Sequence, residues 1–169
     1  MKLRDSVIIV TGSATGLGSA IIKQVAAKGA RVVINYTKSE KEAHETEAVC
    51  DYLGVESILC KADVSVDEDC RRMADLCMEK WGRIDGLVNN AARSVFANSK
   101  DLDALDGQQF MDVYSVNVVG AYQMTRAAAP HMKAGGDGSI VNVSSISALT
   151  GAGSSIAYVA SKGALNTMT

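Results

Sequence analysis

Tyr158 and Lys162 are four positions apart, a spacing that places two side chains on one face of a helix. A free tyrosine has a pKa of about 10, so only about one phenol in a thousand is ionised at neutral pH. A neighbouring ammonium group favours the phenolate and lowers that pKa. The pair could therefore exchange a proton with a carbonyl or alcohol oxygen.

A second group of residues, near the N-terminus, has the composition of a phosphate-binding turn. It follows the apolar run Val7–Val10 and consists of Thr11, Gly12, Ser13, Ala14, Thr15, Gly16, Leu17 and Gly18. The three glycines would permit a tight turn, close approach of a pyrophosphate and close packing of helix on strand, while the helix N-terminus supplies free N–H groups. The pattern predicts a dinucleotide site. A Walker loop is excluded because no Gly-Lys-Ser/Thr follows.

These residues need a scaffold, and apolar segments of strand length alternate along the chain with helical patterns. We expect strands at 7–10, 31–35, 57–60, 84–88 and 139–143, and helices at 17–28, 39–53, 67–81, 105–132 and 156–168. Ser39 is the expected N-cap of the second helix and Asp67 that of the third, and we expect a break in the fourth helix near Gly107. Such alternation predicts an α/β fold, a doubly wound parallel sheet of Rossmann type with helices on both faces. From the length of the sequence we expect residues 1–169 to belong to one domain.

In a sheet of this type ligands bind at the carboxyl ends of the strands. After the second strand come Tyr36, Thr37 and Lys38, where an acid would bind the ribose 2′-OH of NAD. The first acid is Glu40, whereas Lys38 could meet a 2′-phosphate, with Thr37 donating a hydrogen bond. NADP(H) is therefore the preferred cofactor and NAD(H) a possible one. The alternative is that Lys38 is a solvated residue at a helix start.

The third and fourth strands are also followed by polar residues. Asp63, before Val64, could accept a hydrogen bond from an adenine amino group, or could serve only in a turn. The amides after the fourth strand could tie strand ends together and line the cofactor site, or could reflect ordinary turn chemistry. That segment contains Asn89, Asn90, Ala91 and Ala92.

Charge, hydropathy and cysteine usage exclude several other classes of protein. There are 17 Lys and Arg against 19 Asp and Glu, giving a net charge of −2, so no basic footprint for nucleic acid is expected. No apolar run approaches the ~18 residues of a membrane span. The four cysteines form no C-x-x-C pair, and the only histidines, His44 and His131, lie far apart. We expect no metal site, no Ser-His-Asp triad, and a cytoplasmic protein with reduced thiols.

With these motifs in this order, the chain resembles the short-chain dehydrogenase/reductase family over essentially its whole length. The residues that carry the resemblance are the glycines 12, 16 and 18, Asp63-Val64, Asn89-Asn90-Ala91, Asn117, Ser145 and Tyr158-x-x-x-Lys162. Among its branches, the 3-oxoacyl-carrier-protein reductases and glucose-dehydrogenase-like enzymes look most similar. Two positions depart from the family pattern: Ala92 replaces a common glycine, and Thr15 stands where many NADP enzymes carry a basic residue.

The resemblance implies a small-molecule carbonyl or alcohol substrate and a role for each catalytic residue. Tyr158 would be the general acid/base and Ser145 would hold the substrate oxygen. Lys162 would hold the nicotinamide ribose and lower the pKa of Tyr158, and Asn117 would complete a proton relay through water. The alternatives are a non-catalytic nucleotide-binding or regulatory protein on this fold, and a sugar-nucleotide epimerase or dehydratase. The latter usually space their glycines G-x-x-G-x-x-G.

The expected helices at 117–132 and 156–168 carry small and apolar residues on more than one face, which indicates cover on more than one side. In the resembled family the second side commonly packs against another subunit, so we expect a homo-oligomer, a dimer or a homotetramer. Family members also continue through further strands. We therefore expect the natural protein to be longer than residues 1–169.

Overall fold

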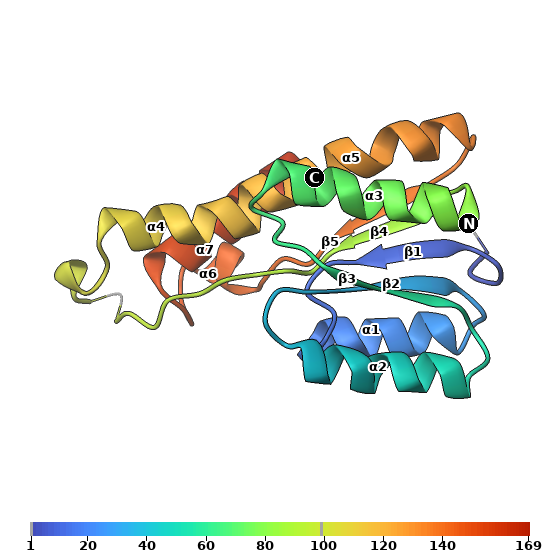
Figure 1. Ribbon diagram of the computed structural model, residues 1–169. Coiled ribbons are helices and arrows are strands. Elements are labelled where there is room, and N and C mark those ends of the chain that lie inside the picture. The colour runs from blue at the N-terminus through green and yellow to red at the C-terminus, as the bar shows by residue number, and fades with distance from the viewer. Residues whose placement is uncertain (1, 99) are drawn as a thin grey trace.

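The computed structural model describes residues 2–98 and 100–169, and its centre is a five-stranded parallel sheet (Figure 1). The strand order is β3-β2-β1-β4-β5, and every neighbouring pair runs parallel. The strands are β1 Val7–Val10, β2 Arg31–Tyr36, β3 Ser57–Lys61, β4 Gly86–Asn89 and β5 Ser139–Asn142. This order confirms the predicted doubly wound α/β fold. Strands β2 and β3 are added on one side of β1, and β4 and β5 on the other, so the strand order reverses between β1 and β4.

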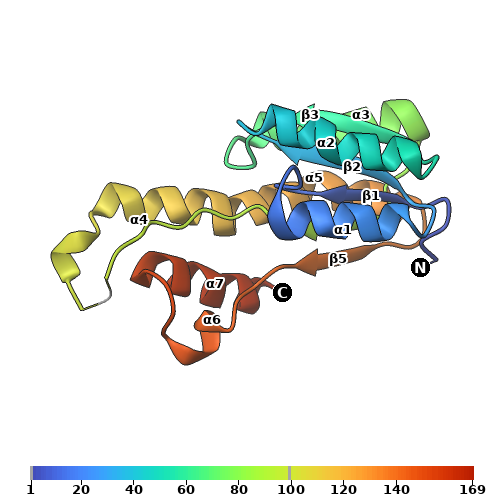
Figure 2. The same cartoon turned by 90° about the horizontal axis from the view of Figure 1, so that it is seen from below.

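Helices cover both faces of the sheet and extend beyond its carboxyl edge. They are α1 Gly16–Ala26, α2 Glu40–Tyr52, α3 Asp67–Trp81, α4 Gly107–Tyr114, α5 Ala121–Ala134, α6 Ser147–Thr150 and α7 Ile156–Met168, with a 3-10 turn η1 Leu102–Ala104 and a π-helical turn η2 Ser115–Gly120. Helices α1 and α2 lie on one face, and α3 and α5 on the other (Figure 1). Helices α4, α6 and α7 project past the ends of the strands (Figure 2).

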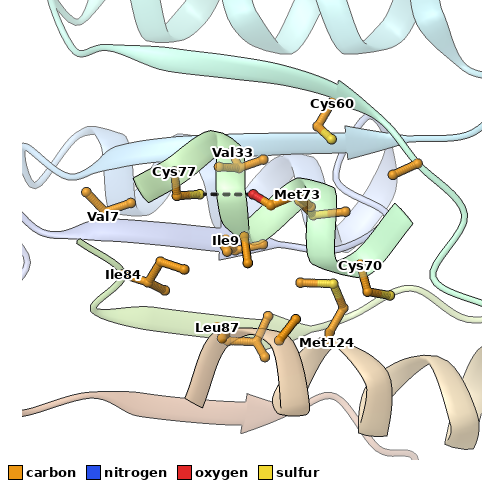
Figure 3. Close-up of a cluster of buried hydrophobic side chains, with 14 of the residues drawn as sticks. Val7, Ile9, Val33, Cys60, Cys70, Met73, Cys77, Ile84, Leu87 and Met124 are labelled. Atoms are coloured by element: carbon orange, nitrogen blue, oxygen red, sulfur yellow. Dashed lines mark hydrogen bonds between the residues drawn. The ribbon is translucent and has the colours of Figure 1, made fainter. Parts of the chain in front are cut away.

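The apolar character of β1 follows from its burial on both faces. Val7 and Ile9 point toward α3 and α5, whereas Ile8 and Val10 point toward α1 and α2. Figure 3 shows the first of these layers, where Met73 and Cys77 of α3 pack over the strands. All four cysteines are free and buried, and burial raises the pKa of Cys70 and of Cys77 to about 12. These thiols serve as apolar packing groups.

The long helical segment was predicted correctly in its extent but not in its irregularity. No break occurs near Gly107, because Asp106 accepts a hydrogen bond from the Gln109 N–H and so begins α4 there. The helix is instead irregular at η2, where Gly120 passes so close to Val64 that an added Cβ would lie 2.7 Å from the valine Cγ2. Asp67 is likewise the first residue of α3 rather than its cap, a position held by Val66.

The outer strand β5 pairs only with β4 within the described residues, and Ile140 and Val141 on it are exposed. Beyond β5 the chain forms the short helix α6, which sequence patterns did not predict, and then α7 (Figure 2). Within the described ranges, no helix has the length and apolar character needed to span a membrane.

Candidate functional site

A cleft of about 810 Å³ lies at the carboxyl ends of β1 to β4. This volume is in the range of pockets that hold small molecules and cofactors. Its lining includes most of the predicted cofactor residues: Gly12, Thr15, Gly16, Leu17, Gly18, Tyr36, Thr37, Lys38, Asp63, Val64, Asn90, Ala91 and Ala92. Four segments far apart in sequence therefore meet where the fold places ligands.

Four predicted cofactor residues are outside the lining, namely Thr11, Ser13, Tyr158 and Lys162. Thr11 and Ser13 instead hold the turn in shape. The Thr11 hydroxyl accepts hydrogen bonds from the backbone N–H groups of Asn90 (3.0 Å) and Ala91 (2.9 Å). The Ser13 hydroxyl, fully buried, donates to Val10 O (2.7 Å). The Asn90 amide donates to the carbonyls of Thr11 and Gly12, so the ends of β1 and β4 are bonded together from both sides.

The glycines give the turn room for an anion. Gly12 and Gly16 have φ values of +60° and +56°, in the left-handed region that favours glycine. A Cβ on Gly18 would lie 2.4 Å from the Gly12 carbonyl oxygen, whereas one on Gly16 would meet no atom within 4 Å. Thr15 makes no side-chain cap, and the first turn of α1 contains no acid. The first N–H groups of α1 and its positive dipole end are therefore available to phosphate, so these residues fit a dinucleotide.

Asn35, at the end of β2, supports the same turn and was not singled out in the sequence. Its carbonyl oxygen accepts from the Gly12 N–H (2.8 Å), and its amide donates to Cys60 O and Ala62 O. The side chain is 2% exposed. It therefore joins the ends of three strands. A polar residue at the carboxyl end of an otherwise apolar strand was the available signal.

Asp63 has the turn role proposed for it and also faces the cleft. Its Oδ1 accepts hydrogen bonds from the N–H (2.9 Å) and the hydroxyl (2.7 Å) of Ser65, which is turn chemistry. The residue also lines the cleft. Because a carboxylate has a second oxygen, Asp63 can stabilise its turn and still accept a hydrogen bond from a ligand.

The rim of the cleft after β2 carries both signs of charge. Thr37 and Lys38 are exposed, and both line the cleft. Tyr36, beside them, is buried, and burial together with the Glu40 carboxylate raises the pKa of its phenol. Lys38 is thus free to meet a phosphate, while Glu40 stands close to Tyr36.

The Tyr158–Lys162 pair lies on α7, next to the end of β5. The Ser155 side chain caps this helix by accepting a hydrogen bond from the Tyr158 N–H. The Lys162 Nζ atom is 5.7 Å from the centre of the Tyr158 ring and donates to Val143 O at 2.7 Å. Lys162 is only 2% exposed, and burial lowers the pKa of its ammonium group. Since an ammonium has three hydrogens, two remain for other partners.

Asn117 connects this pair to the cleft. Its carbonyl oxygen accepts from the Arg93 N–H (2.7 Å), and its amide donates to Arg93 O (3.0 Å) and to the Ser161 hydroxyl (2.9 Å). Arg93 lines the cleft, and Ser161 donates in turn to Tyr158 O. Both amide hydrogens of Asn117 are therefore used by protein groups, so the side chain holds α7 against the loop after β4 and has no hydrogen to offer a water.

Ser145 follows β5 and is half-buried, two positions after the carbonyl that binds Lys162. The arrangement therefore combines an anion-binding turn, a cleft of cofactor size and a buried ammonium beside a phenol. Together these groups can bind a dinucleotide and move a proton to or from a substrate oxygen. No cluster of metal-ligating side chains occurs in the part of the chain that the structure covers.

Comparison with known sequences gives matches along nearly the whole chain. A family model described as short chain dehydrogenase matches residues 6–169. Ketoacyl reductase 2 of the granaticin polyketide synthase of Streptomyces violaceoruber is 41% identical over 157 residues, which cover 93% of this chain and 61% of the relative. NADPH-dependent aldehyde reductase 1, chloroplastic, of Arabidopsis thaliana is 35% identical over 170 residues, which cover 97% of this chain and 58% of the relative. The chain thus spans about three fifths of the length of these relatives.

Solved structures agree with the sequence comparison. The fold superposes with a TM-score of 0.95 on a short-chain dehydrogenase/reductase from Burkholderia xenovorans, at 41% identity, covering 98% of this chain and 69% of that one. NAD⁺-bound xylitol dehydrogenase gives a TM-score of 0.90 at 30% identity, and the match covers 100% of this chain and 64% of that one. The similarity therefore extends to the α7 segment as well as to the dinucleotide-binding turn.

Proposed function

Because the chain belongs to the short-chain dehydrogenase family, we propose that it is an oxidoreductase that transfers a hydride between NADP(H) and a carbonyl or secondary alcohol. The observation that carries the proposal is the Asn117 bridge, which joins the proton-transfer pair on α7 to Arg93 in the wall of the cofactor cleft. An assay of reduced-cofactor oxidation across a panel of carbonyl compounds tests it.

In the proposed reaction Tyr158 protonates the carbonyl oxygen, and in the reverse direction its phenolate takes the proton of the alcohol. The nicotinamide, when bound, supplies or accepts the hydride. Ser145 donates a hydrogen bond to the substrate oxygen, and Lys162 favours the phenolate form of Tyr158 and holds the nicotinamide ribose. Because burial lowers the pKa of Lys162, its ammonium form, and the activity that depends on it, is lost at lower pH than for an exposed lysine.

The rival proposal is a non-catalytic nucleotide-binding or regulatory protein on the same fold. The presence of Ser145, Tyr158 and Lys162 favours an enzyme, since binding alone requires no buried ammonium beside a phenol. The glycine spacing, Gly12-x-x-x-Gly16-x-Gly18, likewise differs from that usual in the epimerases and dehydratases. The substrate we propose is a small molecule. The free, buried cysteines support a cytoplasmic setting.

We expect Lys38→Glu to weaken NADPH binding more than NADH binding, because only NADPH carries a 2′-phosphate for the exposed ammonium to meet. Titrations of the two cofactors, followed by nicotinamide fluorescence, measure both dissociation constants. The wild type should bind NADPH more tightly. Lys41→Glu, three positions further on in the first turn of α2 and outside the cleft lining, is the matched control and should leave the preference unchanged.

Equal affinities of the wild type for the two cofactors, or tighter binding of NADH, would exclude contact between Lys38 and the 2′-phosphate. In that case Glu40, next to Tyr36, is the acid that meets the ribose, and NAD(H) is the cofactor. Both outcomes have precedent in the similar proteins, one named as NADPH-dependent and one solved with NAD⁺.

We further propose that the protein is a symmetric homo-oligomer, a dimer or tetramer. Several apolar residues that suggested this, including Met124, Ala128 and Leu165, are in fact covered within the chain. The support comes instead from Met111, Val119 and Tyr122, which are exposed along one side of the α4–η2–α5 segment. Light scattering on the full-length gene product should give twice or four times the monomer mass, and Val119→Glu should lower it. A wild-type monomer would contradict the proposal.

A further inference from the structure

The hydroxyl of Ser145 receives two hydrogen bonds from a single neighbour. The backbone N–H of Ser147 donates to Ser145 Oγ at 3.2 Å, and the Ser147 hydroxyl donates to the same atom at 2.7 Å. Ser147 is 4% exposed, so its side chain is shielded from water. Ser147 is the first residue of α6. Its side chain is buried, whereas Ile146, just before the helix, and Leu149, within it, are exposed to solvent.

A serine hydroxyl has one hydrogen to donate and two lone pairs to accept with. In Ser145 both lone pairs are used by Ser147, so a further partner of this oxygen has to be an acceptor. Without Ser147 the same hydroxyl could turn and accept a hydrogen bond instead. Ser147 therefore determines whether the Ser145 hydroxyl donates or accepts its next hydrogen bond.

We propose that Ser147 is a positioning residue that makes Ser145 a dedicated hydrogen-bond donor to the substrate oxygen. The inference rests on the proposed function, because it assigns a direction to the contact of Ser145 with a carbonyl or alcohol. A carbonyl oxygen becomes more negative as hydride reaches its carbon, and a donor already in place stabilises that charge. In the reverse direction the alcohol donates its hydrogen to Tyr158, which leaves its lone pair for Ser145.

A double-mutant cycle in the full-length gene product tests this, with carbonyl reduction as the readout. Ser147→Ala should lower kcat by about 3- to 10-fold, the scale of one neutral hydrogen bond, while the dissociation constant of the cofactor and the unfolding midpoint stay near wild type. Ser145→Ala should cost more. The double variant should be no slower than Ser145→Ala, because Ser147 acts only through Ser145.

Two further variants separate a positioning role from a structural one. Ser147→Thr keeps the hydroxyl and should recover most of the lost rate. Thr150→Ala removes an exposed hydroxyl from the same short helix and should leave kcat unchanged. Multiplicative losses in the double variant, or an unchanged kcat in Ser147→Ala, would overturn the inference alone. A wild type that binds the cofactor but reduces no carbonyl would overturn the proposed function as well.

Discussion

Replacing Tyr158 by Phe should lower kcat by at least the ~10²- to 10⁴-fold that a general acid–base group commonly contributes. The ring of residue 158 stays in place near Lys162, and the helix cap by Ser155 uses only the backbone N–H, so folding and cofactor binding should persist. What disappears is the proton donor for the substrate oxygen. Steady-state rates of carbonyl reduction, with cofactor titrations on the same samples, measure both effects.

The matched control for this variant is Tyr52→Phe. Tyr52 ends α2, is 90% exposed and has no part in the site, so its hydroxyl should be dispensable. Near-normal turnover in Tyr158→Phe would show that another group protonates the substrate. Loss of cofactor affinity in parallel with kcat would mean that the phenol acts in binding rather than in proton transfer.

The second large effect is expected from Gly18→Ala, which should abolish dinucleotide binding. The new Cβ would lie 2.4 Å from the Gly12 carbonyl oxygen and 2.6 Å from the Asn90 amide nitrogen, so the turn between β1 and α1 has to open. Overpacking of this kind costs about 1–3 kcal/mol of stability. The fixed backbone of the Gly12 turn would also be displaced from the phosphates. Cofactor fluorescence titration and urea unfolding measure the two consequences.

Gly107→Ala provides the control, because a Cβ there, in the first turn of α4, meets nothing within 4 Å. This variant should bind the cofactor as the wild type does. Gly16→Ala is an informative intermediate: its Cβ clashes with no protein atom, but the residue has a φ of +56° and faces the cleft. It should weaken binding and, because an alanine is strained at this φ, lower stability by about 1–2 kcal/mol. Wild-type affinity in Gly18→Ala would place the cofactor elsewhere.

The strands and the cleft could be predicted from sequence because their signals are local. Val7–Val10 is continuously apolar because it is covered on both faces, and Gly12 and Gly16, which follow it, have conformations that only glycine adopts easily. In a parallel sheet the strand ends converge by topology alone. Thr37, Asp63 and Asn90 could therefore be assigned to one site without knowledge of any contact between them.

The parts that could not be predicted depend on partners distant in sequence. The amide of Asn117 is bonded to Arg93, 24 positions earlier, and to Ser161, 44 positions later. Its role in holding α7 against the loop after β4 is visible only once those segments are packed. The π-helical turn that contains Asn117 likewise has no local pattern, since it accompanies the close approach of Gly120 to Val64. The inward direction of the Ser13 side chain is set by Val10 and Asn35.

The transfer of deuterium from NADPH that carries deuterium at both hydrogen positions of nicotinamide C4 to the carbinol carbon of the product tests hydride transfer most directly. With the full-length gene product and a reactive carbonyl from the panel, mass spectrometry should find one deuterium per alcohol formed, and the labelled product should vanish in Tyr158→Phe. Saturable NADPH binding with no labelled alcohol from any carbonyl would contradict an oxidoreductase and leave a nucleotide-binding protein in its place.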